Sequence, residues 1–131
     1  MNLGFLEGVL AGAVQSGTSV LYAALGEVLV ERAGIINLGV EGSMLMGASV
    51  GFAIAYQTGN PYLGIVAAAL AGGLFTMVFA YLVINRRANQ LATGLALMFF
   101  GVGLSALIGK PYVGRLIDGL PKIEIPFLAQ L

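Results

Sequence analysis

The strongest constraint on the fold is the stretch from Tyr62 to Ile84, which contains no charged residue. About 20 consecutive apolar residues are enough for a helix to cross the hydrocarbon core of a bilayer. Of the 131 residues in the chain, 59% are hydrophobic and 9% are charged, whereas about 25% of the residues of soluble domains are charged. The sequence therefore predicts an all-α, polytopic integral membrane helix bundle with a single transmembrane domain.

Three further apolar segments complete a bundle of about four transmembrane helices. The predicted spans are 3–25, 35–56, 62–84 and 91–109. The segments 26–34 and 85–90 are predicted loops at one end of the bundle. A turn over 57–61 is predicted at the other end, where Asn60 is suited to cap the third helix and Pro61 to occupy its first position.

The last predicted element is an extramembrane tail. Residues 110–131 hold three of the four prolines of the chain, which suits an irregular segment. At the end of this tail, residues 127–129 are apolar and are predicted to begin a further span.

Small residues recur every four positions along the second, third and fourth predicted spans. This spacing lets the backbones of two helices approach closely. The predicted packing positions are Gly39, Ser43, Gly47, Gly51, Gly64, Gly72 and Gly101. Such rows on consecutive helices predict a tight helical hairpin.

Two polar side chains, Asn37 and Glu41, fall within the second predicted span. Positions three and four apart share a helix face, so these two residues are predicted to lie on one face with Met44 and Ala48. A carboxylate at membrane depth costs on the order of a few kcal/mol unless it faces protein or water. Two interpretations stay open: the pair lines a solute pathway, or it bonds to a neighbouring helix and serves packing.

The first predicted span is interrupted by the polar segment 15–19. Either its hydroxyl groups bond back to helix carbonyls and bend the helix slightly, or the helix is broken there and its loosened backbone lines a pathway. Gln15 and Thr18 are therefore further candidates for a pathway role.

One string of residues resembles a known family. The string from Glu31 to Ala48, with Arg86–Gln90 and Gly94–Leu97 downstream, is similar to the permease subunit of bacterial ATP-binding-cassette importers. The most similar branch comprises simple-sugar and nucleoside permeases, which are related to ribose and branched-chain amino-acid permeases. The resemblance covers nearly the whole chain and keeps its order, but such permeases continue into further spans.

The resemblance implies a multi-pass permease component of an ATP-driven importer for nucleosides or simple sugars, in the bacterial cytoplasmic membrane. It implies a separate cassette ATPase, a solute-binding lipoprotein, and a second permease subunit or a C-terminal half as partners. The chain is therefore expected to be an N-terminal half that does not transport alone. A branched-chain amino-acid permease is one alternative. The residues by themselves also allow a small self-associating four-helix channel or membrane assembly protein.

Composition excludes several other classes of function. The chain has no cysteine and no histidine, which removes disulfides, zinc sites of the usual kind and imidazole acid–base chemistry. Six basic and six acidic residues cancel, so no nucleic-acid partner is expected. No GxxxxGK[ST] phosphate loop occurs. We therefore expect no enzyme active site, no metal and no cofactor, with ATP hydrolysed by a partner.

The basic pair Arg86 and Arg87 directly follows the charge-free span and predicts the orientation of the chain. Because Lys and Arg are in excess in cytoplasmic loops, we expect this loop inside and both termini outside. Reporter fusions at Asn89 and Asn60 measure the sidedness. A cytoplasmic signal at Asn89 and an external signal at Asn60 are expected, and an external signal at Asn89 would contradict the orientation.

Overall fold

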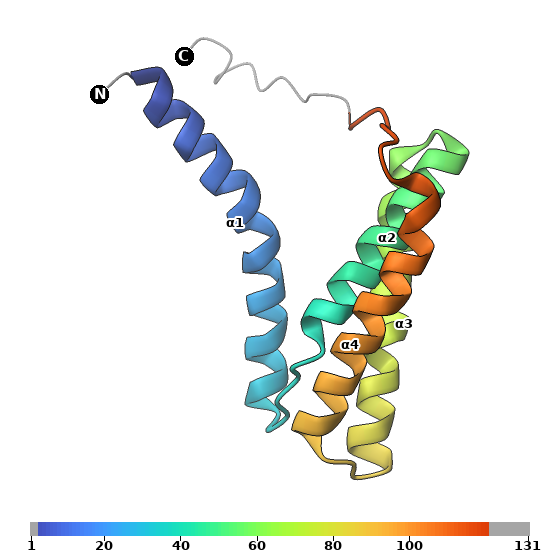
Figure 1. The fold of residues 1–131 in the computed structure, drawn as a ribbon. Coiled ribbons are helices and arrows are strands. Elements are labelled where there is room, and N and C mark those ends of the chain that lie inside the picture. The colour runs from blue at the N-terminus through green and yellow to red at the C-terminus, as the bar shows by residue number, and fades with distance from the viewer. Residues whose placement is uncertain (1–2, 121–131) are drawn as a thin grey trace.

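The computed structural model describes residues 3–120 as four long helices, and no strand occurs in this range (Figure 1). The helices are α1 (Leu3–Arg32), α2 (Val40–Thr58), α3 (Pro61–Ala80) and α4 (Gln90–Gly109). A π-helical turn, Tyr81–Asn85, continues α3, and a 3-10 turn, Lys110–Tyr112, continues α4. Together with these extensions, α3 and α4 are long and apolar enough to cross a membrane, as is α1. The predicted membrane helix bundle is confirmed.

The helix α2 lies at the centre of the bundle and packs along both α3 and α4, which contact each other little (Figure 1). It carries more buried residues than either neighbour, namely Gly42, Met46, Gly47, Gly51, Ala53 and Ala55. It is not among the three helices whose length and apolar character suit a membrane span. Because α3 and α4 cover much of its surface, α2 exposes less of its backbone and side chains to lipid than a peripheral helix would.

The interface between α2 and α3 is a direct backbone contact. A Cβ atom built on Gly51 would lie 2.9 Å from the carbonyl oxygen of Gly64, and one on Gly64 would lie 2.8 Å from the carbonyl oxygen of Gly51. Further along, a Cβ on Gly72 would lie 3.9 Å from the Cα of Gly47. These four predicted packing positions therefore lie at one helix–helix contact.

The closest approach between α2 and α4 involves a glycine that the predicted packing row omits. A Cβ built on Gly101 would lie 2.7 Å from the Cα of Gly42. The predicted positions on either side differ in their contacts: Gly39 precedes α2 and faces Gly94 of α4, whereas the carbonyl of Ser43 faces α3. Since α2 contacts α3 and α4 on different sides, a single four-residue row does not describe its packing.

Apolar side chains fill the space between the three packed helices. The buried cluster comprises Met46, Phe75, Phe79, Val83 and Leu97. All three helices contribute to it, which holds the π-helical end of α3 against the first half of α4. This cluster and the glycine contacts fix the positions of α2, α3 and α4.

The helix α1 stands apart from the other three along most of its length (Figure 1). Its side chains are exposed from Gly4 to Tyr22. The hydroxyl of Thr18 donates to the carbonyl of Val14 at 2.6 Å, and that of Ser19 to the carbonyl of Ser16 at 3.0 Å. These bonds satisfy the hydroxyl groups without breaking the helix, so the interpretation of a broken helix is wrong.

Two predicted boundaries around α1 and α2 are wrong. The segment predicted as the loop 26–34 is helical as far as Arg32, because it contains no proline and its charged residues are good helix formers. The second span, predicted from Ile35, begins only at Val40. The glycine Gly34, with φ of 83°, adopts a left-handed conformation that helices exclude.

The remaining helix bounds agree closely with the sequence. The side chain of Asn60 accepts a hydrogen bond from the backbone N–H of Tyr62 at 2.9 Å, and Pro61 is the first residue of α3, as predicted. The segments 33–39 and 85–89 lie at one end of the bundle and the turn before α3 at the other (Figure 1). The further span predicted at 127–129 lies outside the described residues.

The 3-10 turn after α4 packs against the far end of α2. The ring of Tyr112 lies 5.6 Å from that of Tyr56 and 6.2 Å from that of Phe52, both in edge-on geometry. The side-chain amide of Gln57 donates a hydrogen bond to the Tyr112 hydroxyl. These contacts join α2 and α4 at the end opposite to the segments 33–39 and 85–89.

Replacing Gly101 by leucine should destabilise the bundle, whereas the same change at Gly103 should not. A side chain at 101 meets the backbone of Gly42, whereas no atom of the described residues lies within 4 Å of a Cβ at Gly103. Overpacking of this kind typically costs about 1–3 kcal/mol. Thermal unfolding of both variants in the same detergent measures the difference. Equal midpoints would show that α2 and α4 are not in backbone contact.

Candidate functional site

The segment 33–39, here called the connector, joins α1 to α2 without helical structure. The side-chain Oδ1 of Asn37 accepts a hydrogen bond from the backbone N–H of Gly39 at 2.9 Å. The carbonyl of Gly39 then accepts the first bond of α2, from the N–H of Ser43 at 3.1 Å. An asparagine that bonds two residues ahead stabilises a turn. Asn37 thus fixes the place where α2 begins.

Asn37 is the only polar side chain in residues 4–120 classed as buried, with 6% of its surface exposed. Its Nδ2 donates to Oε1 of Glu27 on α1 at 3.3 Å. Both the donor and the acceptor of this amide are therefore satisfied, as buried polar groups require. Asn37 lies before the helix, so it does not share a helix face with Glu41, and that prediction is wrong.

A second amide, that of Gln90 at the start of α4, holds the other half of the connector. Its Oε1 accepts from the N–H of Ile36 at 2.8 Å, and its Nε2 donates to the carbonyl of Gly34 at 3.4 Å. The sequence alone predicts no role for Gln90. Its position among polar residues at the start of an apolar span was the only local signal, because its partners lie 54 and 56 positions away in the chain.

The backbone of α4 touches the connector one turn after Gln90. A Cβ on Gly94 would lie 2.9 Å from the backbone N of Leu38, and one on Gly39 would lie 3.2 Å from the carbonyl oxygen of Gly94. Any side chain at 94 would push the connector away from α4. Glu27, Asn37, Gln90 and Gly94 therefore hold the connector between α1, α2 and α4.

Glu41 lies in the first turn of α2 and is exposed. A carboxylate at this position interacts favourably with the partial positive charge of the helix N-terminus. The exposed or half-exposed side chains on the same side of the helix are Met44, Leu45, Ala48 and Phe52. We call these five residues the open face of α2, because neither α3 nor α4 covers it.

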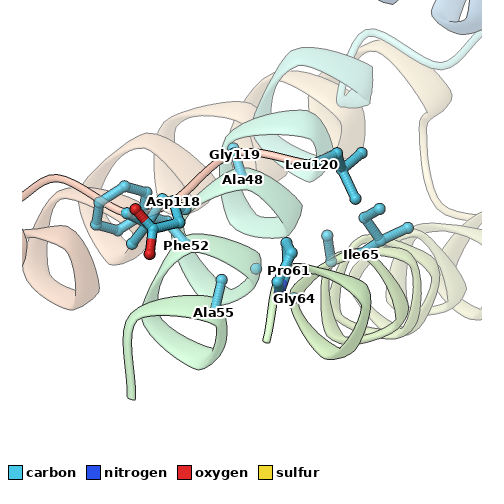
Figure 2. A pocket seen from close by; sticks show the side chains of 12 residues that line it. Ala48, Phe52, Ala55, Pro61, Gly64, Ile65, Asp118, Gly119 and Leu120 are labelled. Carbon is cyan, nitrogen blue, oxygen red and sulfur yellow. The ribbon is translucent and has the colours of Figure 1, made fainter. Parts of the chain in front are cut away.

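Two shallow hollows flank the open face towards the end of α2 that carries Tyr56. One, of about 350 Å³, lies between α2 and α3 and is bordered by Phe52, Gly64 and the segment 117–120 (Figure 2). The other, of about 460 Å³, lies between α2 and α4 and reaches Arg115. Both linings are mostly apolar; among the described residues, Asp118 is the one carboxylate of the first, and the second also carries Ser49, Ser105, Tyr112 and Arg115. These surfaces suit contact with another apolar segment better than binding of a polar solute.

The comparisons with known proteins identify the family. Residues 8–124 match the family described as branched-chain amino acid transport system / permease component. The chain belongs to this permease family. It is 39% identical over 128 residues to the putative glucose ABC transporter permease protein TsgC13 of Haloferax volcanii, covering 98% of this chain and 39% of that protein. No solved structure matches the chain significantly.

The other predicted pathway residues of this permease-family chain lie away from the connector. Gln15 and Thr18 are exposed in the middle of α1. Arg86 and Arg87, which were predicted in a loop and not in the pathway, are exposed in the loop before α4, and Arg87 has a positive φ of 51°. Within residues 3–120, no group of three or more acidic residues is placed to hold a metal ion.

Replacing Asn37 by aspartate should destabilise the permease segment although the cap on Gly39 is kept. The introduced carboxylate would lose the donor to Glu27 and face a second carboxylate in its place. A loss of about 1–3 kcal/mol is expected, because a buried donor is removed and a charged group is left without a partner. Adding Glu27→Gln should restore most of the lost stability, because the amide introduced at position 27 can donate a hydrogen bond to the carboxylate at position 37.

Thermal unfolding in detergent of the two single variants and the double variant measures this coupling. Asn60→Asp is the matched control, since Asn60 caps α3 through its oxygen alone and has no carboxylate partner among the described residues. Additive effects of Asn37→Asp and Glu27→Gln would show that the two side chains do not interact.

Proposed function

We propose that this chain is the N-terminal half of the membrane-spanning permease of an ATP-driven importer for simple sugars or nucleosides, in the cytoplasmic membrane. The observation that carries the proposal is the family match over 8–124. The similarity to a relative named as a putative glucose permease favours a sugar substrate. Membership of a permease family favours an importer over a self-associating channel.

The end of the open face that carries Glu41, away from the two apolar hollows, is the proposed contribution of this chain to the solute pathway. Glu41 is exposed there. A carboxylate that faces lipid is energetically costly, so Glu41 is expected to face water or another protein segment. Carboxylate oxygens accept hydrogen bonds, which matches the hydroxyl groups of sugars and nucleosides. In contrast, both polar groups of Asn37 are bonded within the chain. We therefore assign Glu41 to the pathway and Asn37 to the structure of the connector. Gln15 and Thr18 remain candidates because their helix is exposed.

The proposed partners follow from the same family. The chain covers 39% of its relative, so more than half of that protein has no counterpart here. A C-terminal half or a second permease subunit would pack against α1 and the hollows beside α2, which are apolar and exposed. A separate cassette ATPase and a solute-binding lipoprotein complete the proposed importer.

A branched-chain amino acid is the second candidate substrate, and the description of the matched family favours it. Competition by unlabelled solutes distinguishes the two. Inhibition of uptake by glucose or a nucleoside, but not by leucine, would support the sugar or nucleoside assignment, and the opposite pattern would support the amino acid.

We expect no uptake of labelled glucose, nucleoside or leucine in cells that carry only this chain, the ATPase and the binding protein. Alternating access requires a site between two repeats or bundles, and this chain supplies one bundle. Adding the C-terminal half should restore uptake of one of these solutes. Uptake without that half would refute the proposed division of the permease, and no uptake with it would refute the proposed function.

A further inference from the structure

We propose that Gln90 is a positioning residue that couples the loop 85–89 to the start of α2. In the proposed importer, a displacement of this loop by a cytoplasmic partner would then move α2 and its open face. The substrate pathway and the partner rest on the proposed function. The mechanical connection rests only on the contacts around Gln90.

The first part of the connection runs from the loop into α4. The loop is held to the π-helical end of α3 by two backbone bonds, from Arg86 to Tyr81 at 3.3 Å and from Ala88 to Leu82 at 3.0 Å. The side chain of Asn89 accepts from the N–H of Ala92 at 3.0 Å and so caps α4. The loop is therefore bonded to the π-helical end of α3 on one side and to the first turn of α4 on the other. A shift of the loop would move the first turn of α4 with it.

The second part runs from α4 to the connector. Gln90 bonds with one amide to both an N–H and a C=O of the connector, those of Ile36 and Gly34. This two-point contact fixes the direction as well as the distance of the connector relative to α4. One turn later, the backbones of Gly94 and Leu38 are in contact, which leaves no gap to absorb a displacement.

The third part runs from the connector into α2. The turn held by Asn37 leads directly into the first bond of the helix. Three residues beyond Gly39, the backbone of Gly42 lies against Leu97 and Met98 of α4. The first halves of α2 and α4 therefore move together with the connector. The end of α1 is also bonded to this unit, by the Glu27 side chain and by backbone bonds from residues 33–35 to Val30 and Glu31, whereas α1 before Tyr22 is exposed and does not take part.

The loop also has the chemistry to receive a partner. Arg86 and Arg87 are exposed, and neither guanidinium group forms an ion pair within residues 3–120, so both suit contact with an acidic surface. Arg87 adopts a left-handed φ of 51°, which is uncommon for a residue other than glycine. An acidic cytoplasmic surface of the ATPase is the partner that this loop fits within the proposed importer.

The test uses the importer assembled from this chain, its C-terminal half, the ATPase and the binding protein in proteoliposomes. The variant Gln90→Ala removes both bonds, and Gln90→Glu keeps the acceptor for Ile36 but loses the donor to Gly34. The matched control is Gln57→Ala, which removes another helix-end glutamine bond at the opposite end of the bundle. Solute uptake per ATP hydrolysed is the measured quantity.

For Gln90→Ala, uptake per ATP should fall at least about fivefold, which is the change in an equilibrium for one ordinary hydrogen bond, because this variant loses two bonds. Uptake per ATP for Gln90→Glu should lie between the values of Gln90→Ala and the parent. The value for Gln57→Ala should match that of the parent. An unchanged ratio for Gln90→Ala would overturn the proposal. A fall in uptake and ATP hydrolysis by the same factor would also overturn it, because that result indicates a structural role alone.

A second measurement separates this proposal from the proposed function. The chain contains no cysteine, so nitroxide labels attach only to cysteines introduced at Arg87 and Leu45. In detergent, the parent should give one narrow distance distribution between the labels, and Gln90→Ala a broader one. If no solute is transported but the distribution broadens, the proposed function fails and the mechanical role of Gln90 stands. An equally narrow distribution for both would overturn that role.

Discussion

A buried polar backbone group that lies outside a helix needs a hydrogen-bond partner other than the helix ladder. The connector meets this requirement with two side-chain amides, those of Asn37 and Gln90, which replace bonds that a continuous helix would make. An amide is suited to this task, since it carries a donor and an acceptor without a net charge. The break between α1 and α2, and with it the direction of α2, depends on these bonds.

Once the connector is fixed, glycine contacts determine how the bundle packs. Gly51 meets Gly64 on one side of α2, and Gly42 meets Gly101 on another. Dispersion forces fall steeply with distance, so backbones in contact gain attraction that larger side chains would prevent. A central helix with two such contacts leaves only one side uncovered, and this side is the open face that begins at Glu41.

The sequence predicted those features that depend on neighbouring residues. The charge-free run predicted the helix α3, and Asn60 followed by Pro61 predicted where it begins. Both signals are local, because a cap and a proline act within one helical turn. The start of α2 was predicted five residues too early, since the apolar residues Ile35 and Ile36 suit a helix in isolation. The bonds from Gln90 that hold this segment in the connector come from the start of α4, 54 residues further along the chain. Gly42 was missed for a related reason: the row to which a glycine belongs depends on which helix packs against it.

The central position of α2 also bears on how the chain enters the membrane. Three helices suit insertion on their own by length and apolar character, and α2 is not among them. However, it is joined to the strongly apolar α3 by a turn that a cap and a proline close within a few residues. The backbone contact between Gly51 and Gly64 lies near this turn, so it can form as soon as α3 has been synthesised. Insertion of α2 as a hairpin with α3 would bury the small residues of both helices before lipid reaches them, and the residues that give the folded bundle its tightest contact would then also bring its central helix into the bilayer.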